Sequence, residues 1–275
     1  MTGKPVILED RSVISVSGPD ARSLLERLIT VEAEGMTGPR HGALLTPQGK
    51  ILFEFIVRPE GEDTLLLDVH NTLAAEFVKR LAFYKLRAKA EIADRTDDYA
   101  VVAAFDGDTD LPADPRIAAL GGRAILPRGE TQGLRPGAKA YARHRMTLGV
   151  AELVHDFASG DVFPHEASYD RLRGVDFDKG CFVGQEVVSR MQHRGTARKR
   201  FVPVSIAGDV AEARADVTAG GKVVGTMGGS SGDRGLALLR LDRLDEAGSV
   251  PLECGGARLA AHPPEWLPAA SGAEH

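Results

Sequence analysis

A cysteine within a run of small and polar residues is the first place in this sequence where chemistry can be expected. The run is DKGCFVGQEVVSRMQHRG, residues 178–195. Cys181 follows Lys179 and precedes a helix that the spacing predicts to begin at Gly184. A lysine ammonium and the positive end of a helix both stabilise a thiolate. We therefore expect Cys181 to be a partly accessible, reactive thiol, with Lys179 as its catalytic neighbour.

Other interpretations of Cys181 stay open. A lone cysteine is commonly a small buried hydrophobe. A Cys–His hydrolase with His165 or His193 is a further alternative, but nothing in the spacing selects either partner. In a metal site, His155, His165 or His193 could approach Cys181 in the fold. The chain has no CxxC pair, so a cluster at Cys181 would be transient or shared with a partner, and no resident metal site is predicted. The second cysteine, Cys254, is predicted to be structural or incidental.

The residues around Cys181 add flexibility and charge. Glycines on both sides permit tight turns and close approach of a ligand to the backbone. Glu186 lies in the first helical turn and can pair with Arg190, four residues later. The remaining motif residues and the basic residues after them are Gly180, Phe182, Gly184, Gln185, Arg194 and Arg198. The basic segment is either a solvated face or a rim that attracts an anionic ligand or an acidic partner.

Composition excludes several classes of protein. The chain has 275 residues and a formal net charge of −5, which argues against general nucleic-acid binding. No apolar run reaches the length of about 18 residues that a membrane span needs. Its first residues turn polar within ten positions, unlike a signal peptide, and two cysteines cannot form a disulfide framework. We therefore expect a cytoplasmic protein without a membrane or nucleic-acid partner.

Periodicity predicts an α+β fold followed by a β-barrel. A strand over 11–18 leads into a helix that begins at Pro19, and three apolar runs over 41–70 predict an antiparallel meander. The further elements are a helix over 71–86, strands over 90–96, 99–105 and 123–127, and a helix over 138–147. Short strands with frequent glycines follow from residue 199. We expect a body over 1–198 with an internal break near 97–116, a barrel over 199–268, and a frayed tail over 269–275.

The segment Lys179–Glu186, KGCFVGQE, resembles the K-G-C-[YF]-x-G-Q-E signature of the YgfZ family. These proteins are folate-binding relatives of the glycine-cleavage T-protein, and they include the mitochondrial Iba-type factors for iron–sulfur cluster maturation. The similarity extends over residues 10–265 and includes VSGPDARSLLERLIT, LLTPQGKILFEF, LAFYKLRAKAEI and RGTARKR. It implies a T-protein-like body with antiparallel sheets around a central cavity, and a C-terminal barrel.

The resemblance also implies tetrahydrofolate binding, in which Tyr141 falls near an aromatic position that stacks on folate. Core packing is the alternative for this tyrosine. Thr147 stands where the T-protein has a pterin-binding glutamate, which predicts weak binding, mainly of the folate tail by the arginines at 190, 194 and 198. No T-protein-like catalytic aspartate can be placed. Asp68 lies near the expected region, but nothing in the sequence fixes its role.

The leading hypothesis is therefore a factor that assembles or repairs [4Fe–4S] clusters through Cys181, with a role under oxidative stress. Its expected partners are iron–sulfur scaffold or carrier proteins, client enzymes and folate. One alternative is a tetrahydrofolate-dependent aminomethyl or methylene transferase. The other is a folate-binding regulator without chemistry.

Overall fold

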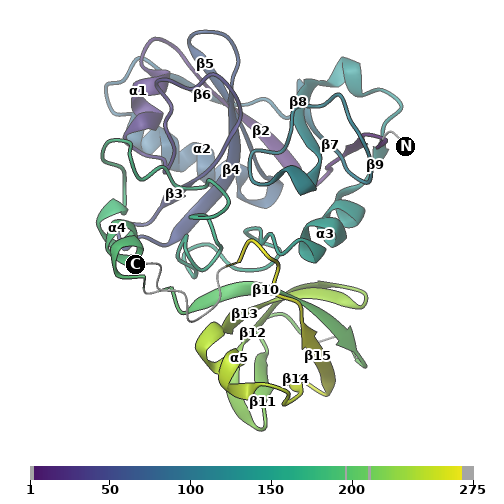
Figure 1. Cartoon of the computed structure of the whole chain (residues 1–275). Coiled ribbons are helices and arrows are strands. Elements are labelled where there is room, and N and C mark those ends of the chain that lie inside the picture. The colour runs from purple at the N-terminus through teal and green to yellow at the C-terminus, as the bar shows by residue number, and fades with distance from the viewer. Residues whose placement is uncertain (1–2, 196, 210–211, 268–275) are drawn as a thin grey trace. The chain divides into compact units, whose positions relative to one another are not determined.

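The computed structural model describes residues 3–195, 197–209 and 212–267. The chain divides into two compact units, Met1–Tyr141 with Leu172–Gln185, and Ala142–Arg171 with Glu186–His275 (Figure 1). Two sheets and most of the helical residues belong to the first unit, and a closed barrel belongs to the second. The predicted α+β class is thereby confirmed.

The larger sheet of the first unit has the strand order β3-β4-β5-β2-β6, with every neighbour antiparallel. Its strands are β2 (Arg11–Ser17), β3 (Arg40–Leu45), β4 (Ile51–Pro59), β5 (Thr64–His70) and β6 (Glu91–Asp94). The meander predicted over 41–70 is confirmed as β3, β4 and β5. Alternation of apolar residues and short polar turns is sufficient to specify such consecutive pairing.

The helix predicted over 71–86 is α2 (Asn71–Lys85), which contacts β2, β5 and β6 (Figure 1). Its buried face packs into the core of the first unit. The Phe77 ring centroid lies 4.9 Å from that of Phe53 and 5.6 Å from that of Phe55. Such aromatic contacts hold the helix on the sheet.

The first helix, α1 (Ala21–Glu26), is shorter than its apolar spacing predicts and begins after Pro19 rather than at it. Ile29 is buried as expected, but it forms a β-bridge with Leu44 instead of continuing the helix. Pairing with β3 therefore replaces the last predicted helical turn. The carbonyl oxygens at this end of the helix are left for another donor.

The second sheet of the first unit has the order β8-β7-β1-β9, in which only β1 and β9 run parallel. Its strands and short helices are β1 (Val6–Ile7), β7 (Tyr99–Ala104), η1 (Ala118–Leu120), β8 (Gly122–Pro127), η2 (Arg128–Thr131) and β9 (Arg135–Pro136). Helix α3 (Ala138–Thr147) follows β9 in the chain, and the boundary between the two units falls within it, after Tyr141. Strands β7 and β8 and helix α3 were predicted. The two-residue strands β1 and β9 are too short to give a periodic signal.

The second unit contains a barrel of six strands, β10-β13-β12-β11-β14-β15, around an apolar core. Its elements are β10 (Lys199–Ala207), β11 (Asp216–Ala219), β12 (Lys222–Ser231), β13 (Arg234–Arg240), α5 (Leu241–Ala247), β14 (Leu252–Cys254) and β15 (Ala257–Ala261). The barrel starts at Lys199, as predicted. The frayed tail predicted over 269–275 lies outside the described residues.

The compact unit around the barrel extends beyond the boundary predicted at residue 199, because it includes residues 142–171 and most of helix α4 (Gln185–Arg194). Asp156 explains part of this difference, since its carboxylate accepts from Gly229 N of β12 at 3.1 Å. Arg200 of β10 also donates to the Asp170 carboxylate and to the His165 carbonyl. Buried polar contacts of this kind leave no pattern in the sequence.

None of the helices in the described part of the chain is long and apolar enough to cross a membrane.

Candidate functional site at the Cys181 loop

The thiol of Cys181 is exposed, whereas the side chains on either side of it are anchored. Phe182 is 7% exposed, and only 2% of the Lys179 side chain is exposed. Gly180 has no neighbour within 4 Å of the position that a Cβ would take. Cys181 therefore sits in open space on a loop that is fixed at both ends, and the interpretation of this cysteine as a buried hydrophobe is wrong.

Lys179 holds the loop to the end of α1. Its Nζ donates to the carbonyl oxygens of Glu26 at 2.8 Å, Ile29 at 3.0 Å and Val31 at 2.8 Å, and lies 3.2 Å from Glu26 Oε1. Three hydrogen bonds satisfy all the protons of an ammonium group. Burial lowers the pKa of Lys179 below its usual value, although the Glu26 carboxylate acts in the opposite direction. Lys179 thus binds main-chain carbonyls, and the structure gives it an anchoring position rather than the expected one beside the thiol.

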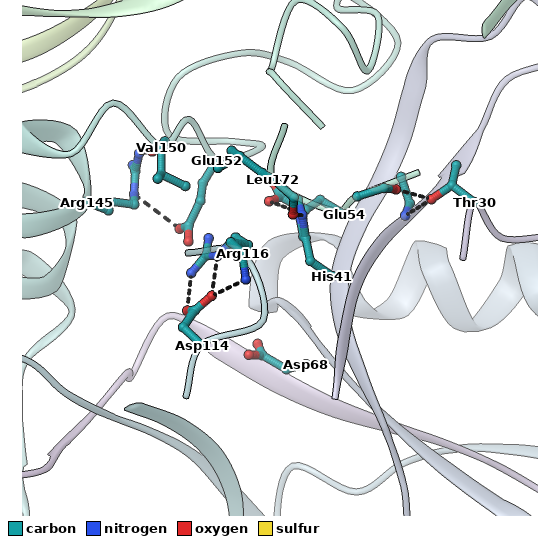
Figure 2. Close-up of polar contacts among 12 residues, drawn as sticks. Thr30, His41, Glu54, Asp68, Asp114, Arg116, Arg145, Val150, Glu152 and Leu172 are labelled. Carbon is teal, nitrogen blue, oxygen red and sulfur yellow. Dashed lines mark hydrogen bonds and ion pairs between the residues drawn. The ribbon is translucent and has the colours of Figure 1, made fainter. Parts of the chain in front are cut away.

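Thr30 fixes the entry to the same loop. Its hydroxyl donates to the Gly174 carbonyl at 2.6 Å and accepts from Ala43 N at 2.9 Å (Figure 2). Its carbonyl accepts from Asp176 N at 2.8 Å. The Asp176 carboxylate in turn accepts from Lys179 N at 3.2 Å. These bonds join the approach to Cys181 to the edge strand β3.

Gly184 fixes the exit from the loop. Its φ of +81° is a conformation that other residues rarely adopt. A Cβ at this position would lie 2.6 Å from the Thr46 carbonyl oxygen and 3.0 Å from Gly49 Cα. The loop therefore packs directly against the turn between β3 and β4. The two sequence segments LLTPQGK and KGCFVGQE meet at this contact.

Helix α4 begins directly after the loop, and the predicted ion pair between Glu186 and Arg190 is present on it. Arg190 Nη2 donates to Glu186 Oε1 at 2.7 Å, and both side chains are largely exposed. Arg194 and Arg198 are exposed as well, and no hydrogen bond or ion pair of their side chains is found among the described residues. Gln185 is partly buried at the helix start. Exposure of Arg190, Arg194 and Arg198 agrees with both alternatives for the basic segment, a solvated face or a rim for an anionic partner. Arg200, at the end of the segment, is instead buried against Asp170.

Tyr141 is buried, at 3% exposure, and therefore offers no open ring face for stacking. Its hydroxyl accepts from Arg123 at 3.1 Å and from Arg116 at 2.5 Å, and it donates to Asp114 at 3.1 Å. Burial acts to raise the pKa of Asp114, but Arg116 and Arg123 outweigh it, and the pKa lies below its usual value. The packing alternative for Tyr141 is the one that the structure supports.

Asp68 is 1% exposed and is held by two arginines, Arg11 at 2.6 Å and Arg123 at 2.7 Å. It lines a pocket of about 280 Å³ whose other walls are mainly apolar residues of β4 and β8 and the prolines at 39 and 112. Both carboxylate oxygens of Asp68 are therefore already engaged by guanidinium groups and do not offer a free acceptor to a pterin ring.

The second unit supplies no carboxylate at the aligned pterin position. Thr147 is exposed, and its hydroxyl donates to the Arg143 carbonyl at 3.0 Å. Within the same unit, buried Arg145 lies 3.3 Å from Glu152 and 2.5 Å from Asp156. These two acids therefore neutralise an internal arginine. His155, His165 and His193 also belong to this unit, and His165 Nε2 lies 3.0 Å from Gln192 Oε1.

A buried histidine–carboxylate pair escaped the sequence interpretation. His41 Nε2 lies 3.1 Å from Glu54 Oε1, and its Nδ1 lies 3.4 Å from the Leu172 carbonyl (Figure 2). His41 is 1% and Glu54 is 6% exposed. One feature of the sequence could have predicted this pair, namely the single carboxylate, Glu54, inside the apolar run ILFEFIV. A charge buried in such a strand requires a polar or charged partner. The pair ties β3 and β4 to residue 172, which opens the segment that carries Cys181.

Comparison with known proteins gives matches over nearly the whole chain. Residues 198–269 match the family model described as CAF17, C-terminal beta-barrel domain. The mitochondrial iron-sulfur cluster assembly factor IBA57 of Mus musculus is 30% identical over 312 residues, covering 96% of this chain and 85% of its own length. The human protein of that name is 29% identical, with the same coverage. The homologue of Mycosarcoma maydis is 32% identical, but the chain spans only 57% of its length.

Among solved structures, the glycine cleavage system aminomethyltransferase T of Bartonella henselae matches with a TM-score of 0.71 and 16% identity. The match covers 96% of this chain and 86% of that one. Identity at this level shows the fold alone. The predicted T-protein-like fold with a C-terminal barrel is confirmed.

The sequence relatives show that the prediction of a cytoplasmic location is wrong. The relatives from Mycosarcoma, mouse, Neurospora and human are all mitochondrial proteins. Two unpaired cysteines exclude a disulfide framework. They do not distinguish one reducing compartment from another.

Proposed function

Because the chain belongs to the family of the IBA57 iron–sulfur cluster assembly factors, we propose that it takes part in assembling or repairing [4Fe–4S] clusters through the thiol of Cys181. The similarity to Iba-type factors is established, while membership of the wider YgfZ family stays a prediction. The observation that carries the proposal is an exposed thiol on an otherwise anchored loop. Thiolates are the ligands that iron–sulfur clusters use.

The proposed step is a ligand exchange on a cluster that a partner protein holds. The Cys181 thiol releases its proton to solvent, an Fe–S bond forms, and the ligand that it replaces leaves the iron. No electron is transferred in this step. The anchors at Lys179 and Gly184 support the proposal because they keep the thiol at the surface, where a partner can reach it without unfolding the loop.

The alternative of a tetrahydrofolate-dependent transferase has less support. Asp68 is held by two arginines, Tyr141 is covered, and position 147 offers a hydroxyl where the T-protein pattern has a carboxylate. The same features disfavour a regulator that binds folate tightly. The proposed function therefore contains no folate step, and its partners are scaffold or carrier proteins and client enzymes that hold [4Fe–4S] clusters.

The test is replacement of Cys181 by Ser in cells that depend on this protein. Ser has nearly the same volume, and the site is exposed, so we expect a normal protein level and an unchanged melting curve. We expect the activity of [4Fe–4S] enzymes to fall several-fold, most strongly under oxidative stress. Full enzyme activity at a normal level of the variant protein would refute the proposal.

Cys254 offers the matched control, but its replacement must be an apolar residue because the position is buried. Its side chain is 1% exposed in the apolar barrel core, and burial raises the pKa of its thiol. A serine hydroxyl would lack a partner there and would destabilise the barrel. Cys254→Ala removes the second thiol without adding a polar group. We expect this variant to support cluster enzymes fully.

A further inference from the structure

An exposed surface at the end of α2 combines apolar and basic side chains. Phe83 is 72% and Leu86 is 87% exposed, the highest values for large apolar side chains in the described part of the chain. They lie three residues apart, at the last turn of α2 and directly after it. Five basic residues surround them in sequence, namely Lys79, Arg80, Lys85, Arg87 and Lys89. We refer to these seven residues as the α2 surface.

The fold itself does not use these two apolar side chains. The buried face of α2 is formed by Ala74, Phe77 and Leu81, which pack into the core of the first unit. The Phe83 ring lies beside the ring of Tyr84, with the two centroids 5.6 Å apart. A large apolar side chain left in water forgoes the free energy that its burial would contribute. Two such residues on one surface favour an interaction site over incidental exposure.

Basic side chains predominate at the α2 surface, and the nearest acidic residues in the sequence, Glu76 and Glu91, stand at its two ends. Residues 77–90 contain the five basic side chains and no acidic one. None of these five side chains has a hydrogen bond or an ion pair among the described residues, whereas Arg58 and Arg95 of the same unit are paired with acids. A shallow pocket of about 270 Å³ lies within the surface, lined by Glu76, Lys79, Arg80 and Phe83.

We propose that the α2 surface is the docking site for an acidic protein surface, on the partner that holds the cluster. The arrangement matches a protein interface, with apolar side chains as central anchors and charges around them. Unpaired lysines and arginines would meet carboxylates of the partner and speed its association. This inference rests on the proposed function, since it names the surface that receives the cluster-holding protein.

A lipid surface is the other class of partner that basic and apolar residues can bind. A helix that lies in a membrane interface presents a continuous apolar face outward. The apolar stripe of α2 is instead turned into the core, and only Phe83 and Leu86 face solvent. The α2 surface therefore favours a protein partner.

The experiment measures binding of a purified, acidic [4Fe–4S] carrier protein to the full-length chain by calorimetry. One variant carries Phe83→Ser with Leu86→Ser, and another carries Lys79→Gln with Arg87→Gln. All four side chains are exposed, so folding should be unaffected. We expect each pair to weaken binding at least tenfold, and we expect added salt to weaken binding of the unmodified chain. Arg135→Gln with Lys139→Gln removes two exposed charges elsewhere in the first unit and should leave binding unchanged.

The outcomes separate this proposal from the proposed function. Unchanged carrier affinity in both α2-surface variants would overturn the docking site, whatever Cys181 does. Binding to vesicles of phosphatidylglycerol and phosphatidylcholine that both pairs abolish, with carrier affinity unchanged, would overturn it in favour of lipid. Cys181→Ser should keep its affinity for the cluster-free carrier, because that affinity does not include the Fe–S bond. If that variant also delivers clusters normally while the α2-surface variants lose binding, the docking site stands and the role of Cys181 fails.

Discussion

The ammonium group of Lys179 has three protons, and the carbonyl oxygens of Glu26, Ile29 and Val31 accept all of them. These carbonyls become available because α1 ends at Glu26 and the chain turns toward β3. One side chain therefore caps a helix and holds the loop that presents Cys181. Its contribution to the site is the position of the thiol.

Replacing Lys179 by Met should destabilise the protein by about 3 kcal/mol, because three carbonyls and the Glu26 carboxylate lose a buried cationic partner. Urea unfolding monitored by circular dichroism would measure this loss. Adding Glu26→Gln to the variant should recover part of the stability, because it removes a charge that has lost its cationic partner, while the amide oxygen can still accept from Ala33 N. A Lys179→Met protein as stable as the unmodified chain would contradict the anchoring position.

Among the elements, the loop between residues 178 and 184 depends on one close backbone contact. Gly184→Ala should cost about 2 kcal/mol, because the new Cβ would combine an unfavourable φ with a collision against the Thr46 carbonyl. Gly180→Ala is the matched control, since nothing lies within 4 Å of its Cβ position. Unfolding midpoints and the native rate of Cys181 alkylation would be compared. Equal effects of the two substitutions would show that the contact with the turn is unimportant.

His165 connects helix α4 with strand β10. Its Nε2 lies 3.0 Å from Gln192 Oε1 of α4, and its carbonyl accepts from Arg200 of β10. Burial lowers the pKa of His165 below its usual value of 6.5, with Asp170 and Gln192 opposing this effect and Arg200 reinforcing it. The unfolded chain then binds more protons below pH 6.5, so stability should be complete above that pH and fall as the pH decreases toward the lowered pKa. His165→Gln should reduce this acid-induced loss in melting experiments between pH 7.5 and pH 5.5. The same pH dependence in both proteins would exclude His165 as the cause.

The sequence predicted most elements because their patterns are local. Apolar runs separated by polar turns marked β3, β4 and β5, helical spacing marked α2 and α3, and the interval of four residues marked the Glu186–Arg190 pair. The length of α1 was wrong because strand pairing competes with helical spacing at Ile29. In the site, too, local features were predictable and contacts between distant residues were not. Exposure of the Cys181 loop was expected, but the position of Lys179 was not, since its acceptors lie about 150 residues away in the chain.

At the scale of the whole chain, the division into units also depends on contacts between residues far apart in the sequence, which local patterns do not predict. The predicted start of the barrel at Lys199 agrees with β10, yet residues 142–171 join the barrel unit through contacts such as Asp156 to Gly229. Cys181 and the α2 surface both belong to the first unit. The proposed partner contacts and the proposed chemistry therefore reside in one compact part of the protein.

The decisive measurement is the rate of cluster transfer from a [4Fe–4S] carrier protein to an apo client enzyme, followed by recovery of the client's activity. The unmodified chain should accelerate transfer. The acceleration by Cys181→Ser should be at least tenfold smaller, although this variant melts normally and still binds the carrier. Cys254→Ala should accelerate transfer as much as the unmodified chain does. Acceleration by Cys181→Ser equal to that of the unmodified chain would contradict the proposal that this thiol carries the function.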